Sequence, residues 1–100
     1  MGSTLGVLQP LSPDHLDAIV MAIQRGDESA FAAFYDAMAP LVLGIVGLTV
    51  KDAVGRFDVA AGAFVQLWQQ APQFDRATQS VTSWVAATAH ARAVASLGAA

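Results

Sequence analysis

The apolar residues of this chain recur at the three- and four-residue spacing of an amphipathic α-helix in four separate stretches. These stretches are Leu16–Ile23, Phe31–Met38, Phe57–Trp68 and Val81–Thr88. No other run alternates apolar and polar residues with the two-residue period of a half-buried strand. Short connections separate the helical stretches, so sequence neighbours are expected to pack antiparallel. We therefore predict an all-α fold, a compact bundle of about four to five helices.

Capping residues and helix breakers predict the ends of the first two helices. Ser12 is a good N-cap, with Pro13 at the first helical position, where its missing N–H costs nothing. Gly26 is expected to end this helix, and Asp27 to cap the next one. Pro40 is predicted either to break that second helix or to open another.

The segment Leu41–Val50 has two interpretations. Its valines and glycines suit a buried strand on propensity alone. Because no partner strand is predicted, we expect a helix. A polar loop is predicted over Lys51–Gly55, followed by a long helix from about Arg56 to Gln70.

The last third of the chain is predicted to hold a loop and a final helix. Pro72 is expected to end the preceding helix, and residues 73–79 to form a loop with one aromatic residue, Phe74. Ser80 is a credible N-cap for a helix that frays after Leu97 and Gly98.

Length and composition indicate one domain, and its charge limits the partners that it can bind. We predict a disordered lead over residues 1–12 and a single helical domain over 13–100. The net charge is −3 with only five Lys and Arg residues, which argues against a general nucleic-acid binder. The start lacks the features of a signal peptide, and the most apolar window, Leu41–Val50, is too short to span a bilayer. The chain is therefore expected to be cytoplasmic, with no membrane partner.

No constellation of residues predicts catalysis or a bound cofactor. The sequence has no cysteine, no phosphate-binding loop, no paired carboxylates and no nucleophile–base pair. His90 has only His15 as a second imidazole, so a metal site is not expected. We predict that the protein is not an enzyme and carries no cofactor or metal.

Three ordered blocks of sequence resemble region 2 of bacterial extracytoplasmic-function (ECF) sigma factors, members of the sigma-70 family. The first is Gln24–Phe31 followed by Phe34 and Tyr35, similar to the turn that joins the first two helices of that region. The second and third blocks resemble the polymerase-docking helix and the promoter-melting loop with its helix. They comprise Asp58-Val59 with Phe64–Trp68, and Phe74–Arg76 with Ser80, Trp84 and Ala89–Val94. The resemblance covers about residues 14 to 97 in the family's order and spacing.

The resemblance implies a role in transcription initiation, with contacts to the RNA polymerase clamp and to the melted minus-ten strand of the promoter. The polymerase contacts that it implies are Asp58, Val65 and Leu67. The residues that it implies for single-stranded promoter DNA are Phe74, Asp75, Arg76, Ser80, Trp84, His90 and Arg92. An anti-sigma factor is a further partner that the family implies.

Physical chemistry gives some of these residues alternative roles. Phe74 and Trp84 would offer a stacking wall for unpaired bases. An aromatic residue at helical spacing more often fills the core, and for Trp84 we weigh the two roles evenly. Phe57, Phe64 and Trp68 share a helical stripe and are expected in the core. Asp58 could serve as a favourable charge in the first turn of its helix instead of a polymerase contact.

The sequence also departs from the family pattern in ways that predict weak DNA binding. Ala61 and Gly62 stand where the family typically has Gln and an acidic residue, and no arginine cluster follows Arg92. The four charges from Phe57 onward sum to zero, so few phosphate contacts are available. We also expect no second domain with the family's helix-turn-helix. The alternative hypothesis is a helical protein-interaction module that binds polymerase or an anti-sigma factor without binding DNA.

Overall fold

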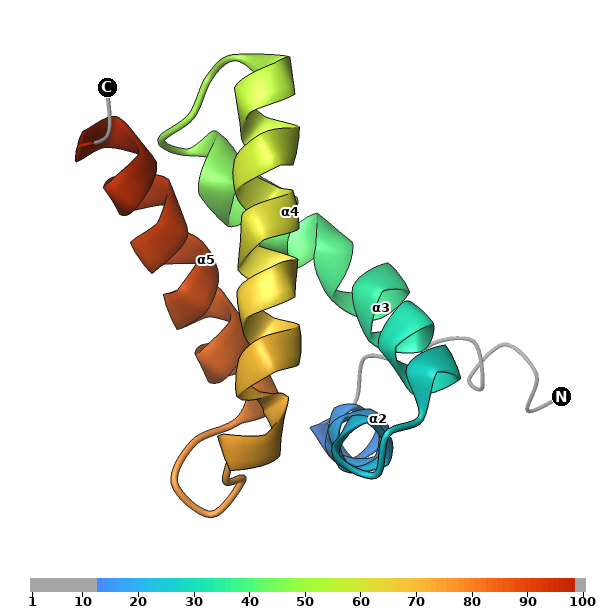
Figure 1. Cartoon of the computed structure of the whole chain (residues 1–100). Coiled ribbons are helices and arrows are strands. Elements are labelled where there is room, and N and C mark those ends of the chain that lie inside the picture. Colours follow the sequence, from blue (N-terminus) through green and yellow to red (C-terminus); the bar gives the residue numbers. More distant parts are fainter. Residues whose placement is uncertain (1–12, 99–100) are drawn as a thin grey trace, which may run out of the picture.

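The computed structural model describes residues 13–98, and within that range it contains four α-helices, one short 3-10 helix and no strand (Figure 1). The elements are α2 (Pro13–Gln24), α3 (Glu28–Gly47), α4 (Ala53–Gln70), the 3-10 helix η2 (Ala71–Gln73) and α5 (Val81–Gly98). The predicted all-α fold is confirmed. The expected lead over residues 1–12, with the Ser12 cap, lies outside the described residues.

The turn between α2 and α3 forms as the sequence predicted. Gly26 has a φ of 88°, in the left-handed region that glycine adopts without steric cost. The Asp27 carboxylate then caps α3, because its Oδ1 accepts hydrogen bonds from the N–H groups of Ser29 (3.0 Å) and Ala30 (3.3 Å). The Ser29 hydroxyl donates a third bond to the same oxygen at 2.7 Å, and this bond is the main reason that the pKa of Asp27 is lowered.

Helix α3 continues through Pro40, so the predicted break or new start at this proline is wrong. Met38, Val42 and Val46 are all buried, and they form one continuous apolar stripe on both sides of the proline. Pro40 itself is exposed. Packing of this stripe therefore outweighs the roughly 3 kcal/mol that an internal proline costs a helix. The predicted helical state of Leu41–Val50 is confirmed as far as Gly47.

The connection between α3 and α4 is shorter than predicted, because α4 begins at Ala53 and not near Arg56. Asp52 caps the helix by accepting the N–H of Gly55 at 2.8 Å. The Arg56 side chain reaches back to the connection and donates to the carbonyl oxygens of Val50 (3.4 Å) and Lys51 (3.0 Å). Gly55 therefore lies in the first turn of α4, where the sequence predicted a loop.

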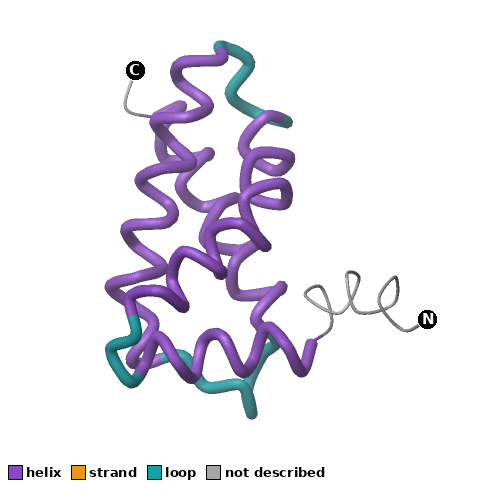
Figure 2. The backbone as a smooth tube through the Cα atoms, turned by 90° about the vertical axis from the view of Figure 1, so that its right-hand side faces the viewer, coloured by secondary structure: helices purple, strands orange, loops and turns teal. Residues whose placement is uncertain are grey.

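The helices pack around one core to which all four contribute. Helices α4 and α5 run antiparallel side by side, α3 crosses behind α4, and α2 lies across the foot of the bundle (Figures 1 and 2). A chain of aromatic contacts links the elements: Phe34 packs against Phe64 and Trp84, with ring centroids 6.2 Å apart in both pairs. The buried residues of the antiparallel helices α4 and α5 include Ala60 and Ala63 on α4, and Ala89 and Ala93 on α5. These small side chains let the two helices approach closely.

Helix α3 is the one described helix that is long and apolar enough to cross a membrane by length and composition. The expectation that the apolar window is too short for a bilayer was based on Leu41–Val50 alone, whereas the helix begins at Glu28. The core helix of a soluble protein meets the same criteria, and α3 packs against α2, α4 and α5. This property alone is therefore weak support for a membrane span.

Candidate functional site

The loop between η2 and α5 holds four of the predicted DNA contacts, Phe74, Asp75, Arg76 and Ser80. Hydrogen bonds to Asp75 fix the backbone of this loop. The Asp75 carboxylate accepts the N–H of Ala77 at 2.9 Å, and its carbonyl oxygen accepts the N–H of Thr78 at 3.0 Å. The Thr78 hydroxyl donates to the same carbonyl at 2.9 Å. Gln24, at the end of α2, donates to the carbonyl of Phe74 at 3.0 Å. Asp75 therefore shapes the turn, with its carboxylate engaged inside the loop.

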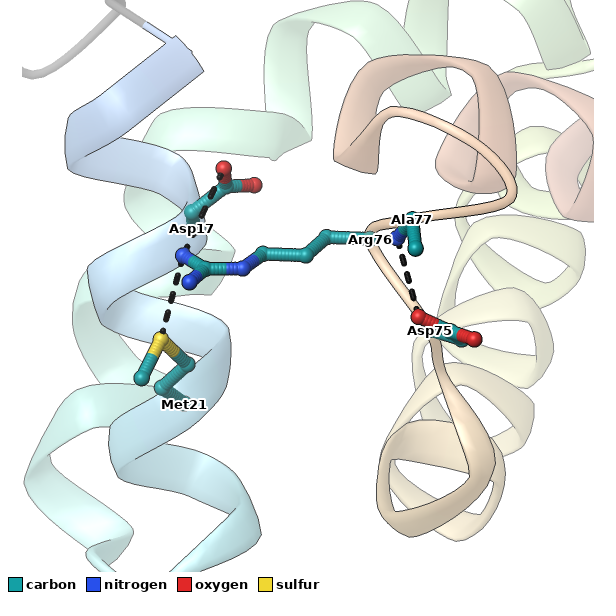
Figure 3. Close-up of polar contacts among 5 residues, drawn as sticks. All are labelled: Asp17, Met21, Asp75, Arg76 and Ala77. Atoms are coloured by element: carbon teal, nitrogen blue, oxygen red, sulfur yellow. Dashed lines mark hydrogen bonds and ion pairs between the residues drawn. The ribbon is translucent and has the colours of Figure 1, made fainter.

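Arg76 extends from this loop to α2 (Figure 3). Its Nη1 lies 4.0 Å from Oδ2 of Asp17 and 3.4 Å from the sulfur of Met21. The Arg76 side chain is 59% exposed, so the ion pair is largely screened by solvent and contributes at most about 1 kcal/mol. The guanidinium is therefore available to a phosphate at a small energetic cost.

Phe74 and Trp84 stack on each other, with ring centroids 4.6 Å apart and planes inclined by 31°. Trp84 is only 7% exposed and also packs on Phe34, so most of its surface belongs to the core. Phe74 is half-buried. Beside this stack lies an open hollow of about 300 Å³, which we call the amide hollow. It is lined by Gln70, Gln73, Phe74, Gln79 and Trp84.

Ser80 caps α5, as predicted, because its hydroxyl oxygen accepts the N–H of Ser83 at 3.0 Å. One of the N–H groups at the N-terminus of α5 is therefore occupied by the cap and not available to a phosphate. Arg76, Ser80 and the first residues of α5 line a second hollow of about 290 Å³ together with Asp17. The structure thus brings Arg76 and the positive end of α5 together, but it adds a carboxylate that disfavours an anion there.

His90 and Arg92 lie apart from the loop. Both are exposed on α5, and Arg92 lies about 12 Å further along the helix axis than Trp84. The Arg92 guanidinium crosses α4 at Gly62: a Cβ atom on Gly62 would lie 2.7 Å from Nη2 of Arg92. Arg92 also lines a hollow that contains Asp58. The structure therefore groups Arg92 with the outer face of α4 and not with the Phe74–Trp84 stack.

The three predicted polymerase contacts on α4 are placed differently from one another. Asp58 is exposed and Val65 is 56% exposed, so both face solvent. Leu67 is 1% exposed and packs in the core, so its side chain is not available to a partner in this structure. The prediction that Leu67 contacts polymerase is corrected on this ground.

The expected core positions on α4 also need correction. Phe64 is buried, at 4% exposed, as predicted. Phe57, however, is 59% exposed and Trp68 38% exposed. Beside Phe64, the core takes Ala60, Ala63 and Leu67 in place of Phe57 and Trp68. Sequence periodicity failed here because α4 carries two apolar faces, and only one of them is buried.

Between α3 and α4 the exposed aromatic residues form an apolar groove of about 470 Å³ that the sequence did not predict. It is lined by Glu28, Phe31, Tyr35, Ala61, Phe64, Val65 and Trp68. Within it Tyr35 contacts Phe64 with ring centroids 4.6 Å apart, and Phe31 contacts Trp68 at 4.8 Å. The helical spacing of Phe31 and Tyr35 was visible in the sequence, but it suggested core packing and not a groove.

The described residues 13–98 include no group of three or more His, Cys, Asp or Glu side chains that could hold a metal ion. The site consists of aromatic rings, amides, two arginines and an apolar groove. Such an arrangement suits binding of another macromolecule.

The sequence is similar to those of curated bacterial sigma factors of the ECF class. ECF RNA polymerase sigma factor SigK of Mycolicibacterium vanbaalenii is 33% identical over 85 residues, which are 85% of this chain and 43% of that protein. SigK of Mycobacterium ulcerans is 33% identical over 85 residues, and SigK of Mycobacterium tuberculosis 34% over 84; the match covers 46% and 44% of these proteins. The chain thus spans less than half the length of these relatives.

The chain is therefore homologous to a segment of the ECF RNA polymerase sigma factors, and the family resemblance seen in its ordered motifs is confirmed. No protein-family model matches the chain. No solved structure matches it either.

Proposed function

We propose that this chain acts in transcription initiation as a sigma-factor domain of the region-2 type, in the cytoplasm and without enzymatic activity. The observation that carries the proposal is its 33% identity over 85 residues to SigK, which is named an ECF RNA polymerase sigma factor. In support of the proposal, the segments that resemble the polymerase-docking helix and the promoter-melting loop form α4 and the η2–α5 loop of one helical bundle.

The amide hollow is the proposed site for an unpaired base of the minus-ten strand. Amide groups both donate and accept hydrogen bonds, as the Watson–Crick edge of a flipped base requires. Gln73 and Gln79 line the hollow beside the exposed part of Phe74, which supplies an aromatic surface for stacking. Arg76 and the Ser80 end of α5 lie next along the loop and would face the phosphates on one side.

The proposed polymerase contacts are Asp58 and Val65, because both face solvent on α4. The polymerase clamp is the partner that the family resemblance indicates for this helix. Arg92 crosses α4 beside Asp58 and would contribute to the same contact. His90 is exposed on α5 and remains a proposed contact to DNA.

DNA binding is expected to be weak. Arg76 and Arg92 are the two cations from Phe57 onward, and Arg76 is paired with Asp17 in the free protein. Each missing phosphate contact removes counterion release, which supplies much of the affinity of proteins for nucleic acids. Polymerase binding would then be needed to hold the domain at a promoter.

The test is binding of the full chain to a fluorescent single strand of minus-ten sequence and, separately, to a purified clamp fragment. Gln79→Ala and Gln73→Ala are expected to weaken strand binding several-fold, whereas Gln69→Ala, an exposed glutamine outside the amide hollow, is the matched control and should leave it unchanged. Asp58→Ala should weaken clamp binding alone. Equal binding by all three glutamine variants would exclude the amide hollow as the base site.

The apolar groove between α3 and α4 supports a second function, that of an interaction module that binds a protein and not DNA. Its aromatic lining resembles the grooves that receive the apolar face of an amphipathic helix. An anti-sigma factor is the proposed partner. Binding of a purified anti-sigma factor, lost on Tyr35→Glu and accompanied by no strand binding, would favour this function over the first.

A further inference from the structure

The outer face of α4 carries an exposed apolar stripe, three of whose residues, Ala61, Val65 and Trp68, also line the apolar groove beside α3. At 100° per residue its members fall within an arc of about 80° and extend over about 21 Å of helix axis. Val54 is 70% exposed, Phe57 59%, Val65 56% and Trp68 38%, and Ala61 is also exposed. We call these five residues the outer stripe. In Figure 1 α4 stands in front of α3 and α5, and its outer side faces open space.

The spacing of the outer stripe is symmetric about Ala61. From Val54 the intervals are three, four, four and three residues, so the pattern reads the same in both directions. Spacing by three and four residues is that of a seam packed against another helix. A palindromic seam has the further property of being complementary to an antiparallel copy of itself. Such a copy would be related to the first by a two-fold axis through Ala61.

The side-chain sizes fit the same arrangement. In an antiparallel pair about Ala61, Trp68 meets Val54 of the other copy, and Phe57 meets its Val65. Each contact thus couples an aromatic residue with a smaller aliphatic one. At the centre Ala61 meets Ala61, and its small side chain lets the two helix backbones approach closely.

Charges along one edge of the stripe are complementary in this arrangement. Asp58 borders the stripe on the side of α5, and Arg92 crosses α4 at Gly62 on the same side. The two-fold axis is perpendicular to the plane of the paired helices. It therefore places the α5 side of one copy on the same side of the pair as the α5 side of the other. Asp58 of one copy then lies within about two residue rises, roughly 3 Å along the axis, of the level of Arg92 in the other. Each dimer would contain two such pairs.

We propose that the outer stripe is the interface of an antiparallel homodimer, in which Asp58 of each copy pairs with Arg92 of the other. A second copy is favoured over a different helix because palindromic spacing, paired side-chain sizes and edge charges all match the stripe to itself. The proposal requires neither DNA nor polymerase binding. It does predict that polymerase and a second copy of the chain compete for Asp58 and Val65.

The first test is sedimentation of the full chain over a concentration series. The average mass should rise from 10.4 kDa toward twice that value as the concentration increases. Val65→Glu should weaken self-association at least tenfold, whereas Val94→Glu, an exposed valine on α5 outside the stripe, should leave it unchanged. Far-ultraviolet circular dichroism confirms that both variants fold. A mass that stays at 10.4 kDa at all concentrations overturns the proposal, as does a dimer that Val65→Glu leaves intact.

The second test uses charge reversal and separates pairing between copies from pairing within one. Asp58→Arg and Arg92→Asp should each weaken the homodimer, because each places like charges opposite one another at both pair sites. A mixture of the two single variants should form a heterodimer more tightly than either variant self-associates, since both of its sites then hold one Arg and one Asp. Pairing within one chain cannot give this result. A mixture that associates no better than its components overturns the proposed pairing, as does a stripe that binds only a helix of a different protein.

Discussion

Gly62→Ala tests how Arg92 is held against α4. Alanine in place of a glycine inside a helix contributes about 1 kcal/mol through lower backbone entropy in the unfolded state and better helix propensity. Against this gain, the new Cβ would lie 2.7 Å from Nη2 of Arg92 and 3.5 Å from its Cζ and Nε. These atoms are the far end of an exposed, flexible side chain. Within residues 13–98 Arg92 makes no hydrogen bond or ion pair that its displacement would break. We therefore expect a net stabilisation of about 0.5–1 kcal/mol.

The assay is urea unfolding followed by circular dichroism, at a concentration where the chain is monomeric. With a slope of about 2 kcal/mol/M, the midpoint should rise by roughly 0.25–0.5 M. Gly44→Ala is the matched control, because Gly44 is an exposed glycine inside α3 whose added Cβ would meet nothing within 4 Å. The difference between the two variants measures the cost of moving Arg92, and it should vanish in the background of Arg92→Ala. A fall in the Gly62→Ala midpoint while Gly44→Ala rises would refute the reasoning, because it would show that Arg92 is rigidly held.

Three further predictions follow from the charges, the core and the cap. The affinity for single-stranded DNA should depend only weakly on salt. The logarithm of the binding constant should fall with the logarithm of the salt concentration with a slope no steeper than about −1.4, because Arg76 and Arg92 supply at most two phosphate contacts of about −0.7 each. Anisotropy titrations that gave a slope steeper than about −3 would contradict this. Phe34→Ala should lower the free energy of unfolding by about 3–5 kcal/mol, because Phe34 is 1% exposed and packs on three aromatic rings. Phe57→Ala, at a 59% exposed position, should change the monomer's free energy of unfolding by less than about 1 kcal/mol. The pKa of Asp27 is lowered in the folded state, so its capping contribution is complete above its ordinary pKa and is lost as the pH falls through the folded value. The urea midpoint of wild type should therefore fall more between about pH 5 and about pH 2.5 than the midpoint of Asp27→Asn. Parallel pH profiles of the two proteins would show that the cap does not titrate.

The helices could be predicted from the sequence because apolar spacing and caps agree along most of the chain. Gly26 and Asp27 act through local geometry, and so the turn that they form was visible in the sequence. The start of α4 was missed although Asp52 offered an N-cap signal, because Gly55 suggested a loop. Pro40 was misjudged for a different reason: its effect depends on the packing of the helix on both sides, which local sequence does not report.

The candidate site was less predictable, because it depends on which of two apolar faces of α4 turns inward. Periodicity identified Phe57 and Trp68 as apolar positions, but it could not show that alanines occupy the buried face in their place. The crossing of Arg92 over Gly62 joins residues 30 positions apart in the chain, and only the packing of α5 on α4 reveals it. The amide hollow likewise combines the end of α4 with the start of α5.

The distribution of side-chain size on α4 links the stability of the fold to the proposed dimer. The buried face includes Ala60 and Ala63, whereas the outer stripe exposes Phe57 and Trp68. Apolar area removed from water contributes roughly 25 cal/mol per Å², so much of the hydrophobic free energy available to α4 is not used within the monomer. Association through the outer stripe would use this free energy. Because only the folded state associates, its apparent stability rises with protein concentration. The unfolding temperature of wild type should therefore rise with protein concentration, whereas that of Val65→Glu should not.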